Sequence, residues 1–415
     1  MTKVKPKVKA IAWLLCLVYF ASYVMRINFQ ALVSHVGDVL DKTEDEMAVI
    51  LTALTITYGL GQILCGVLGD KIKPRLMLTI GFGIAISCNV AMFFFETNIL
   101  AMTIIWGING FAHAMYWPPI VKLMAVHLKD EEYSYASVRV TWGSSIATIL
   151  LYLGCSFLIG VIEWRTIMLL CAILGAMIMV VWIVLCPKLF KETDKNEKVN
   201  DMVNDKEKAW IKPPRYVFLP LILIMFAIIM QGALRDGVTA WMPDYLISEF
   251  QIPTQWSILT TVILAIFSMI SFTVFNYINS RFFKNEVLSA AVIFVIATVS
   301  SGLLYLSDSF KFAMPSILFM SILVACMHGV NLMLIAIAPK RFKRSGKVST
   351  YSGIMNACTY VGSAIATYGI AKLANVFGWG AAILTWIGIA LLGATLCFVA
   401  YPKWKKMRKE YDSEE

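Results

Sequence analysis

Long apolar stretches, repeated along nearly the whole chain, are the feature that most constrains this sequence. A helix that crosses the hydrocarbon core of a bilayer needs about 20 consecutive apolar residues. Hydropathy indicates twelve such stretches, at residues 11–34, 46–69, 75–96, 99–126, 134–160, 164–186, 216–246, 256–280, 286–307, 312–337, 348–375 and 379–402. Only 15% of the 415 residues are charged, against about 25% in a soluble domain. The sequence therefore predicts an all-α integral membrane protein with twelve transmembrane helices.

One polar segment divides the twelve stretches into two sets of six. Residues 187–215 contain eight basic and six acidic residues and end near Pro213 and Pro214. We interpret this segment as a solvated cytoplasmic linker. It separates an N-terminal six-helix bundle at 1–186 from a C-terminal bundle, with a cytoplasmic tail, at 216–415.

The two predicted bundles share features that suggest a duplicated unit. Three pairs of residues recur in corresponding stretches at nearly one spacing: His113 with His328 and Trp164 with Trp379 at 215 residues, and Arg26 with Arg235 at 209. Two pseudo-symmetric repeats with a binding site near the midplane are a transporter architecture.

The basic residues are distributed unevenly between alternate loops. If the N-terminus is cytoplasmic, 28 of the 36 Lys and Arg lie on the cytoplasmic side, four lie outside and four lie within the apolar stretches. This asymmetry predicts that both termini are cytoplasmic in the cell inner (plasma) membrane. The net charge of +10 is then a consequence of topology, and we expect no nucleic-acid partner.

Two of the four embedded basic residues, Arg26 and Arg235, occupy matched places in the two bundles. An arginine deep in a membrane helix costs at least ~2.5 kcal/mol. The stretch around Arg26 contains no acidic residue, and Asp236 follows Arg235. Because neighbouring helical residues point about 100° apart, we expect Arg235 and Asp236 not to pair directly. A dianionic ligand could supply the missing charge, since the guanidinium fork matches phosphate oxygens. The alternative is a structural pair that binds backbone carbonyls or reaches outward.

Other polar and aromatic residues in the stretches are weaker candidates. Tyr19 and Tyr23 lie on the same helical face as Arg26. Each could equally serve helix packing, as could Tyr58, Trp117, Trp241 and Tyr360. Trp117-Pro118-Pro119 interrupts the fourth stretch, and its two prolines predict a kink there, where a cavity or a simple bend is possible.

Titratable side chains offer few other functions. His113 and His328 could carry protons, although a histidine in a membrane helix more often binds a neighbouring helix. Lys122 and Arg139 could extend to the cytoplasmic boundary, or Arg139 could guide anions inward. The nine Cys show no CxxC spacing and the four His are scattered, so neither a cofactor nor a metal is expected. An enzyme is the least favoured reading because no catalytic cluster is visible.

The loop after the second stretch carries a more specific pattern. Gly66, Gly69, Asp70, Lys71 and Arg75 resemble the GxxxD(R/K)xGR(R/K) signature of the major facilitator superfamily, with Lys73 and Pro74 replacing its usual Gly and Arg. The resemblance implies rocking of two bundles around a midplane site. It also implies conformational roles for Asp70, Lys71 and Arg75, to which we add Arg139 as a further gating candidate.

Within that superfamily, the sequence resembles the organophosphate:phosphate antiporters, which include bacterial glycerol-3-phosphate and hexose-phosphate transporters. Five segments carry this resemblance: Tyr19–Phe29, Tyr58-Gly59, Trp117-Pro118-Pro119, Leu234–Leu246 and Tyr360–Ser363. It implies that Arg26 and Arg235 grip phosphate. Gln62, Gly143 and Asp236 stand where the glycerol-3-phosphate transporter has Lys, His and Tyr, so the remainder of the pocket differs.

These observations predict a secondary transporter, functional as a monomer, that exchanges a small phosphate-bearing anion for inorganic phosphate across the lipid bilayer. The predicted substrate-binding residues are Tyr19, Tyr23, Arg26, Tyr58, Gln62, Trp117, Arg235, Asp236, Trp241 and Tyr360. Two alternatives stay open: a proton-coupled organic-anion symporter, and a sugar-phosphate sensor that moves nothing.

Overall fold

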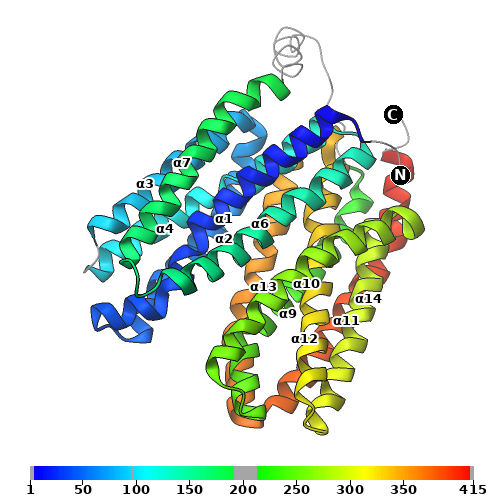
Figure 1. The fold of residues 1–415 in the computed structure, drawn as a ribbon. Helices are drawn as coiled ribbons and strands as arrows, with labels where there is room; N and C mark the ends of the chain where they lie inside the picture. The colour runs from blue at the N-terminus through cyan, green and yellow to red at the C-terminus, as the bar shows by residue number, and fades with distance from the viewer. Residues whose placement is uncertain (1–3, 96–97, 191–212, 412–415) are drawn as a thin grey trace. The chain divides into compact units, whose positions relative to one another are not determined.

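The computed structural model describes residues 4–95, 98–190 and 213–411, and nearly all of them are helical (Figure 1). Most of the predicted linker, at 191–212, lies outside the described residues. Contacts between helices group the chain into two units. Unit 1 comprises the described residues of Met1–Lys212 together with Phe342–Ile354, and unit 2 comprises Pro213–Arg341 and Met355–Glu415 as far as they are described.

Unit 1 is built from seven helices that account for the first six predicted stretches. They are α1 (Pro6–Leu40), α2 (Glu44–Lys71), α3 (Pro74–Phe94), α4 (Ile99–Ala114), α5 (Trp117–His127), α6 (Asp130–Leu158) and α7 (Trp164–Leu189). The fourth stretch is interrupted between α4 and α5, as the two prolines predict, and Trp117 opens the new helix. Within this unit α1 packs along α6 and α7, and α2 packs along α4.

Unit 2 contains the other six predicted stretches. Its elements are η1 (Arg215–Val217), α9 (Phe218–Phe250), α10 (Thr254–Ile278), η2 (Asn279–Phe283), α11 (Glu286–Ser309), α12 (Ala313–Asn331), η3 (Leu332–Ile337), η4 (Ala338–Ser345), α13 (Val348–Phe377) and α14 (Trp379–Tyr411). The first turns of α13 and the end of η4 group with unit 1. Within unit 2, α9 packs along α12 and α14, and α11 packs along α14.

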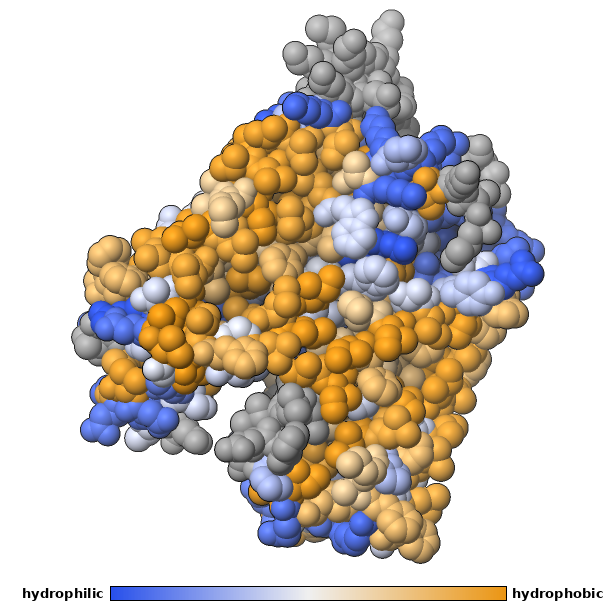
Figure 2. Space-filling model, in the orientation of Figure 1, coloured by the Kyte–Doolittle hydropathy of each residue, from blue (hydrophilic) through white to orange (hydrophobic). Residues whose placement is uncertain are grey.

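The helices have the length and surface of membrane spans. Eleven spans in the described residues are long and apolar enough to cross a bilayer, and α13, with 30 residues, is the twelfth helix of the predicted set. Figure 2 shows hydrophobic side chains over the flanks of the helices and hydrophilic ones gathered near the helix ends. Large apolar side chains such as Leu100, Ile365 and Val399 are more than half exposed, which suits a lipid environment. The chain is therefore a multi-pass integral membrane protein.

Three buried asparagines hold α1 at the turn that carries Arg26. The carbonyl of Met25 accepts hydrogen bonds from Asn89 Nδ2 of α3 at 3.0 Å and from Asn109 Nδ2 of α4 at 3.1 Å. Asn28 donates to Asn89 Oδ1 at 2.6 Å. None of the three asparagines is exposed. Because a buried amide is costly unless it is hydrogen-bonded, this network fixes α1 against α3 and α4 beside Arg26.

Two glycines allow α9 and α13 to approach closely. A Cβ atom built on Gly232 would lie 2.0 Å from the carbonyl oxygen of Thr359, and one on Gly362 would lie 1.9 Å from that of Ile229. Gln231 of α9 accepts a hydrogen bond from Thr359 at 3.4 Å and donates to the Met327 carbonyl of α12 at 3.1 Å. The contact therefore joins three helices next to Arg235.

A buried carboxylate fastens one end of unit 2. Glu286, at the start of α11, is 1% exposed and lies 3.1 Å from Arg341 Nε and 3.2 Å from Arg408 Nη1. Trp404 Nε1 donates to the same carboxylate at 2.9 Å. Breaking a buried pair of this kind leaves an uncompensated charge, so Glu286 ties η4 and α14 to α11.

Replacing Asn89 by Ala should destabilise the protein. The change deprives the Met25 carbonyl of one donor and leaves the Asn28 amide without its acceptor, which should lower the free energy of unfolding by about 1–3 kcal/mol. The measurement is the thermal unfolding midpoint of the purified protein in detergent. Ser156→Ala is the control, because Ser156 is exposed and bonds only its own helix. Equal midpoints for the two variants would contradict the network.

A matched pair of glycine variants tests the contact between α9 and α13. Gly362→Ala should destabilise by about 1–3 kcal/mol because the new methyl group overlaps α9. Gly369→Ala lies on the same helix, where an added Cβ meets nothing within 4 Å, and should stabilise by about 0.5–1 kcal/mol. Both changes are measured as shifts in the unfolding midpoint, and shifts of the same sign would show that the helices do not meet at Gly362.

Candidate functional site

Five predicted residues come together in unit 1. The Arg26 guanidinium carbon lies 4.2 Å from the ring centre of Tyr23 and 4.7 Å from that of Tyr58. The Tyr19 ring is 5.1 Å from Tyr23 and 5.2 Å from Trp117. The expected shared face of Tyr19, Tyr23 and Arg26 is therefore present in α1, and α2 and α5 add one aromatic residue each. We call these five residues the unit 1 cluster.

Two buried donors accompany the unit 1 cluster. Gln62 lies one helical turn after Tyr58 on α2 and is not exposed, and neither end of its amide has a hydrogen-bond partner within the described ranges. The indole nitrogen of Trp117, itself 2% exposed, is also without a partner there. Buried polar groups are normally satisfied, so these two groups are suited to meeting a polar ligand.

In unit 2 the structure corrects one expectation. Arg235 and Asp236 pair directly, with Nε 2.6 Å from Oδ1 and Nη2 2.8 Å from Oδ2. The 100° between neighbouring Cβ directions does not prevent this, because the long arginine side chain can fold back to its neighbour. Ser363 of α13 donates to Asp236 as well. We call Arg235, Asp236 and Ser363 the unit 2 cluster.

The unit 2 cluster is accessible rather than sealed. The side chain of Arg235 is 15% exposed and that of Asp236 is 33% exposed. Tyr360 is half-buried and lies three residues before Ser363 on α13, and Trp241 is half-buried and lies six residues after Arg235 on α9. The closely packed glycines described above set the positions of α9 and α13, and hence of the cluster.

The two span histidines occupy packing positions. His113 is buried and stacks on Tyr116, with ring centres 5.4 Å apart. His328 meets the Phe272 ring edge to face at 5.6 Å. Arg139 stacks on its own helix, 3.8 Å from the Tyr135 ring centre and 5.0 Å from that of Trp142. Its predicted gating role stays a prediction.

The signature after the second stretch has a clear physical role in unit 1. The Asp70 carboxylate accepts hydrogen bonds from the backbone N–H groups of Ser349 and Thr350, each at 3.0 Å, and from the Thr350 hydroxyl at 2.5 Å. It thus binds the N-terminus of α13, where the helix dipole favours an anion. Cβ atoms on Gly66 and Gly69 would each lie 2.9 Å from Ser349, so both glycines permit this contact.

Lys122 supports the same turn and was not recognised as doing so from the sequence. Its ammonium donates to the carbonyls of Gly69 and Asp70 at 2.8 and 3.1 Å, which satisfies the C-terminal end of α2. The signal in the sequence was the presence of a basic residue, Lys122, deep within an apolar stretch. The asparagines 28, 89 and 109 gave a similar signal as amides within apolar stretches, but their partners are remote in sequence.

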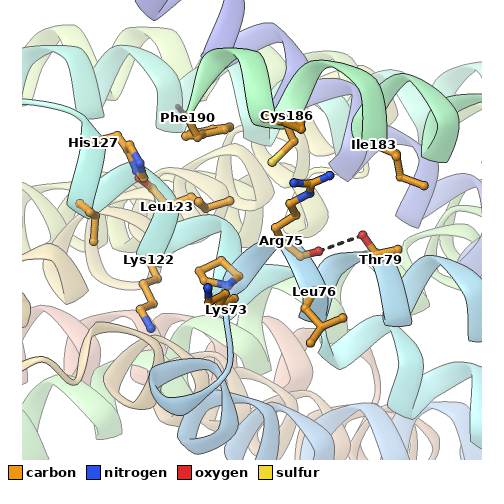
Figure 3. Close-up of a pocket in the computed structure, with 13 residues that line it drawn as sticks. Lys73, Arg75, Leu76, Thr79, Lys122, Leu123, His127, Ile183, Cys186 and Phe190 are labelled. Carbon is orange, nitrogen blue, oxygen red and sulfur yellow. Dashed lines mark hydrogen bonds between the residues drawn. The ribbon is translucent and has the colours of Figure 1, made fainter. Parts of the chain in front are cut away.

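A cavity of about 460 Å³ in unit 1 lies apart from the clusters (Figure 3). Its walls come from α3, α5 and α7 and include Lys73, Arg75, Lys122 and His127. Arg75 extends toward Cys186, whereas the Lys122 side chain points away from Phe190. None of the predicted substrate-binding residues lines this cavity. The predicted substrate-binding residues lie instead in the two clusters or beside them on the same helices.

In the ranges that the structure describes, no three His, Cys, Asp or Glu side chains gather in a way that could hold a metal ion. All nine cysteines are buried and free. The chemistry of the two clusters is that of arginine with aromatic, hydroxyl and amide groups, which suits recognition of an oxyanion.

Comparisons with known proteins agree with this fold. Residues 15–367 match the family model described as Major Facilitator Superfamily. The chain is 24% identical to a probable hexose phosphate transport protein of Chlamydia trachomatis serovar D, over 93% of this chain and 88% of that protein. It is 23% identical to the glycerol-3-phosphate transporter of Bacillus subtilis strain 168, over 94% and 91%.

A membrane sensor protein of Escherichia coli strain K12 is 21% identical, over 87% of this chain and 84% of the sensor. Among solved structures, a proton:xylose symporter of the superfamily has a TM-score of 0.73 at 12% identity and 95% coverage of both chains. A bacterial homologue of the iron transporter ferroportin has a TM-score of 0.70 at 12% identity, over 95% and 99%.

The resemblance to the organophosphate:phosphate antiporters is thus confirmed, because the relatives named above are members of that family. The chain belongs to the Major Facilitator Superfamily and has its fold of twelve membrane helices.

Proposed function

We propose that the protein exchanges a small organophosphate for inorganic phosphate by alternating access, with Arg26 and Arg235 binding the phosphate. The observation that carries the proposal is the stacking of the Arg26 guanidinium on the Tyr23 and Tyr58 rings. Stacking engages the face of a guanidinium, whereas a phosphate oxygen is bound by its edge. A stacked arginine is therefore held in place for a ligand.

Other groups in unit 1 would complete such a site. The Gln62 amide and the Trp117 indole N–H lack partners among the described residues, and the hydroxyls of Tyr19, Tyr23 and Tyr58 add donors to phosphate or to a substrate hydroxyl. The names of the relatives in Chlamydia and Bacillus support a phosphate-bearing substrate. In this proposal Trp241 and Tyr360 contact the organic part from unit 2.

The proposal includes the arrangement expected from the sequence. Two six-helix bundles at 1–186 and 216–415, joined by a cytoplasmic linker, rock about the ligand as a monomer in the inner membrane, with both termini cytoplasmic. An empty site holds excess positive charge and reorients slowly, whereas a bound anion neutralises the site and allows the change. Exchange then becomes obligatory.

Counterflow measures this function directly. Full-length protein is reconstituted in liposomes loaded with labelled phosphate, and efflux is tested against external phosphate, glycerol phosphate, hexose phosphates, phosphoglycerates and phosphonates. Efflux that needs an external phosphate compound supports exchange. Uptake that needs only an imposed pH gradient would favour proton symport, and binding without flux would favour a sensor like the Escherichia coli relative.

Replacing either arginine by lysine should lower exchange at least about tenfold although charge is kept, because lysine lacks the planar fork of donors that a guanidinium offers. Arg26→Lys and Arg235→Lys are compared with Arg165→Lys. Arg165 pairs with the exposed Glu163 at 2.7 Å outside the two clusters, so this control should exchange normally. Normal exchange by Arg26→Lys or by Arg235→Lys would contradict the mechanism.

We also propose that Asp70 controls the change of conformation together with Lys71, Arg75 and Arg139. Asp70→Asn removes the charge that binds the N-terminus of α13 and should lower the maximal exchange rate while leaving the half-saturating phosphate concentration unchanged. Asp130→Asn, an exposed acid in the first turn of α6, is the control. A changed half-saturation with an unchanged maximal rate would instead place Asp70 in ligand binding.

A further inference from the structure

We propose that the cavity of unit 1 binds the headgroup and the upper acyl chains of an anionic phospholipid. The cavity holds about 460 Å³ and is walled by α3, α5 and α7 (Figure 3). This volume falls within the range of small-molecule sites, about 300–1,000 Å³. Such binding requires only that the helices span a bilayer, so it does not depend on the exchange proposed above.

The cavity lies at the level of the membrane where lipid headgroups are found. Its walls are the first turns of α3 and the last turns of α5 and α7. Because α4 and α5 together make one crossing and the other helices of unit 1 make one each, these three helix ends lie on the side of the membrane that holds the N-terminus. In the proposed arrangement this is the cytoplasmic side, where anionic lipids attract basic groups.

Positive charge gathers at the cavity without matching negative charge in its walls. Lys73, Arg75 and Lys122 line it, and the sequences of α3, α5 and α7 contain no Asp or Glu. In the described part of the chain, two groups of acids adjoin these helix ends. Asp70 binds the N-terminus of α13, and Asp130–Glu132 open α6 and do not line the cavity. The cavity therefore favours a negatively charged occupant.

Two of these basic residues are placed to meet a phosphate group. Lys73 and Arg75 are exposed, and the Arg75 side chain extends toward Cys186 on the opposite wall (Figure 3). Lys122 donates to two carbonyls at the end of α2, so it adds positive charge to the wall. Since a guanidinium edge binds phosphate oxygens well, we assign Arg75 and Lys73 to the phosphodiester of the lipid.

Apolar side chains make up much of the remaining lining and favour a lipid over a dissolved anion. They include Leu76, Leu123, Val126, Ile183 and Phe190. Leu76, Val126 and Ile183 are each more than a third exposed, so the apolar wall continues onto the outer surface of these helices. A dissolved anion would leave these side chains in contact with water, whereas an acyl chain covers them.

Competition between two phospholipids tests the site. Full-length protein is purified in a neutral detergent, freed of native lipid and mixed with equal amounts of phosphatidylglycerol and phosphatidylcholine that carry the same acyl chains. Native mass spectrometry then counts the lipids that stay bound. Both lipids contain a phosphodiester, but choline cancels its charge. We expect one phosphatidylglycerol to be retained in preference to phosphatidylcholine, and equal retention would overturn the inference.

Charge variants locate the preference. Arg75→Gln should lower it about fivefold and the double variant Lys73→Gln/Arg75→Gln about 25-fold, because each basic residue contributes about this factor to the binding of an anionic lipid. Arg281→Gln is the matched control: Arg281 is exposed and lies in η2, at a helix end on the same side of the membrane. Equal losses in Arg75→Gln and Arg281→Gln would overturn the inference, because the preference would then come from surface charge in general.

A variant that fills the cavity keeps all its charges. Val126→Trp adds a large ring to the lining and should lower phosphatidylglycerol retention at least about fivefold, without changing the unfolding midpoint measured in the absence of lipid. Val180→Trp is the control, because Val180 is exposed on α7 and does not line the cavity. Unchanged retention by Val126→Trp would overturn the inference.

Inorganic phosphate serves as a probe without acyl chains. It is added to the protein that has bound phosphatidylglycerol, in excess over the lipid. We expect the lipid to stay bound, because the apolar walls hold its chains. Release of the lipid by inorganic phosphate at a concentration equal to that of the lipid would overturn the inference and assign the cavity to a dissolved anion.

Discussion

Charge within the hydrocarbon layer is the constraint on which the rest of this structure depends. Water cannot solvate a charge there, so other side chains must do so. Arg26 faces aromatic rings from its own helix and from α2, and Arg235 pairs with Asp236. Tyr58 of α2 meets Arg26, and Ser363 of α13 donates to Asp236, so each arrangement also involves a second helix and the polar residues help to determine packing.

The helices and the location of the charges could be predicted from sequence because both are local properties. A run of about 20 apolar residues specifies a membrane helix whatever its neighbours are. A spacing of three and four residues likewise specifies one face of that helix, and Tyr23 indeed stacks on Arg26. The break before Trp117 followed from the two prolines for the same reason.

The positions of the ends of long side chains, and the residues that they contact, could not be predicted in this way. The Cβ direction limits where an arginine starts, but its guanidinium can turn back to the next residue, as Arg235 does toward Asp236. Partners remote in sequence were also hidden. Asn28 and Asn89 are 61 residues apart, and an amide within an apolar stretch indicates that a partner exists without indicating which one.

The two arginines at matched positions have different surroundings. Arg26 lies against the rings of Tyr23 and Tyr58, which carry no charge, whereas Arg235 meets the Asp236 carboxylate through Nε and Nη2. A tyrosine ring covers the face of a guanidinium, and a carboxylate occupies one of its edges. The sequence predicts a positive charge at both positions, and the neighbouring residues, which differ between the two units, determine which part of each guanidinium is occupied.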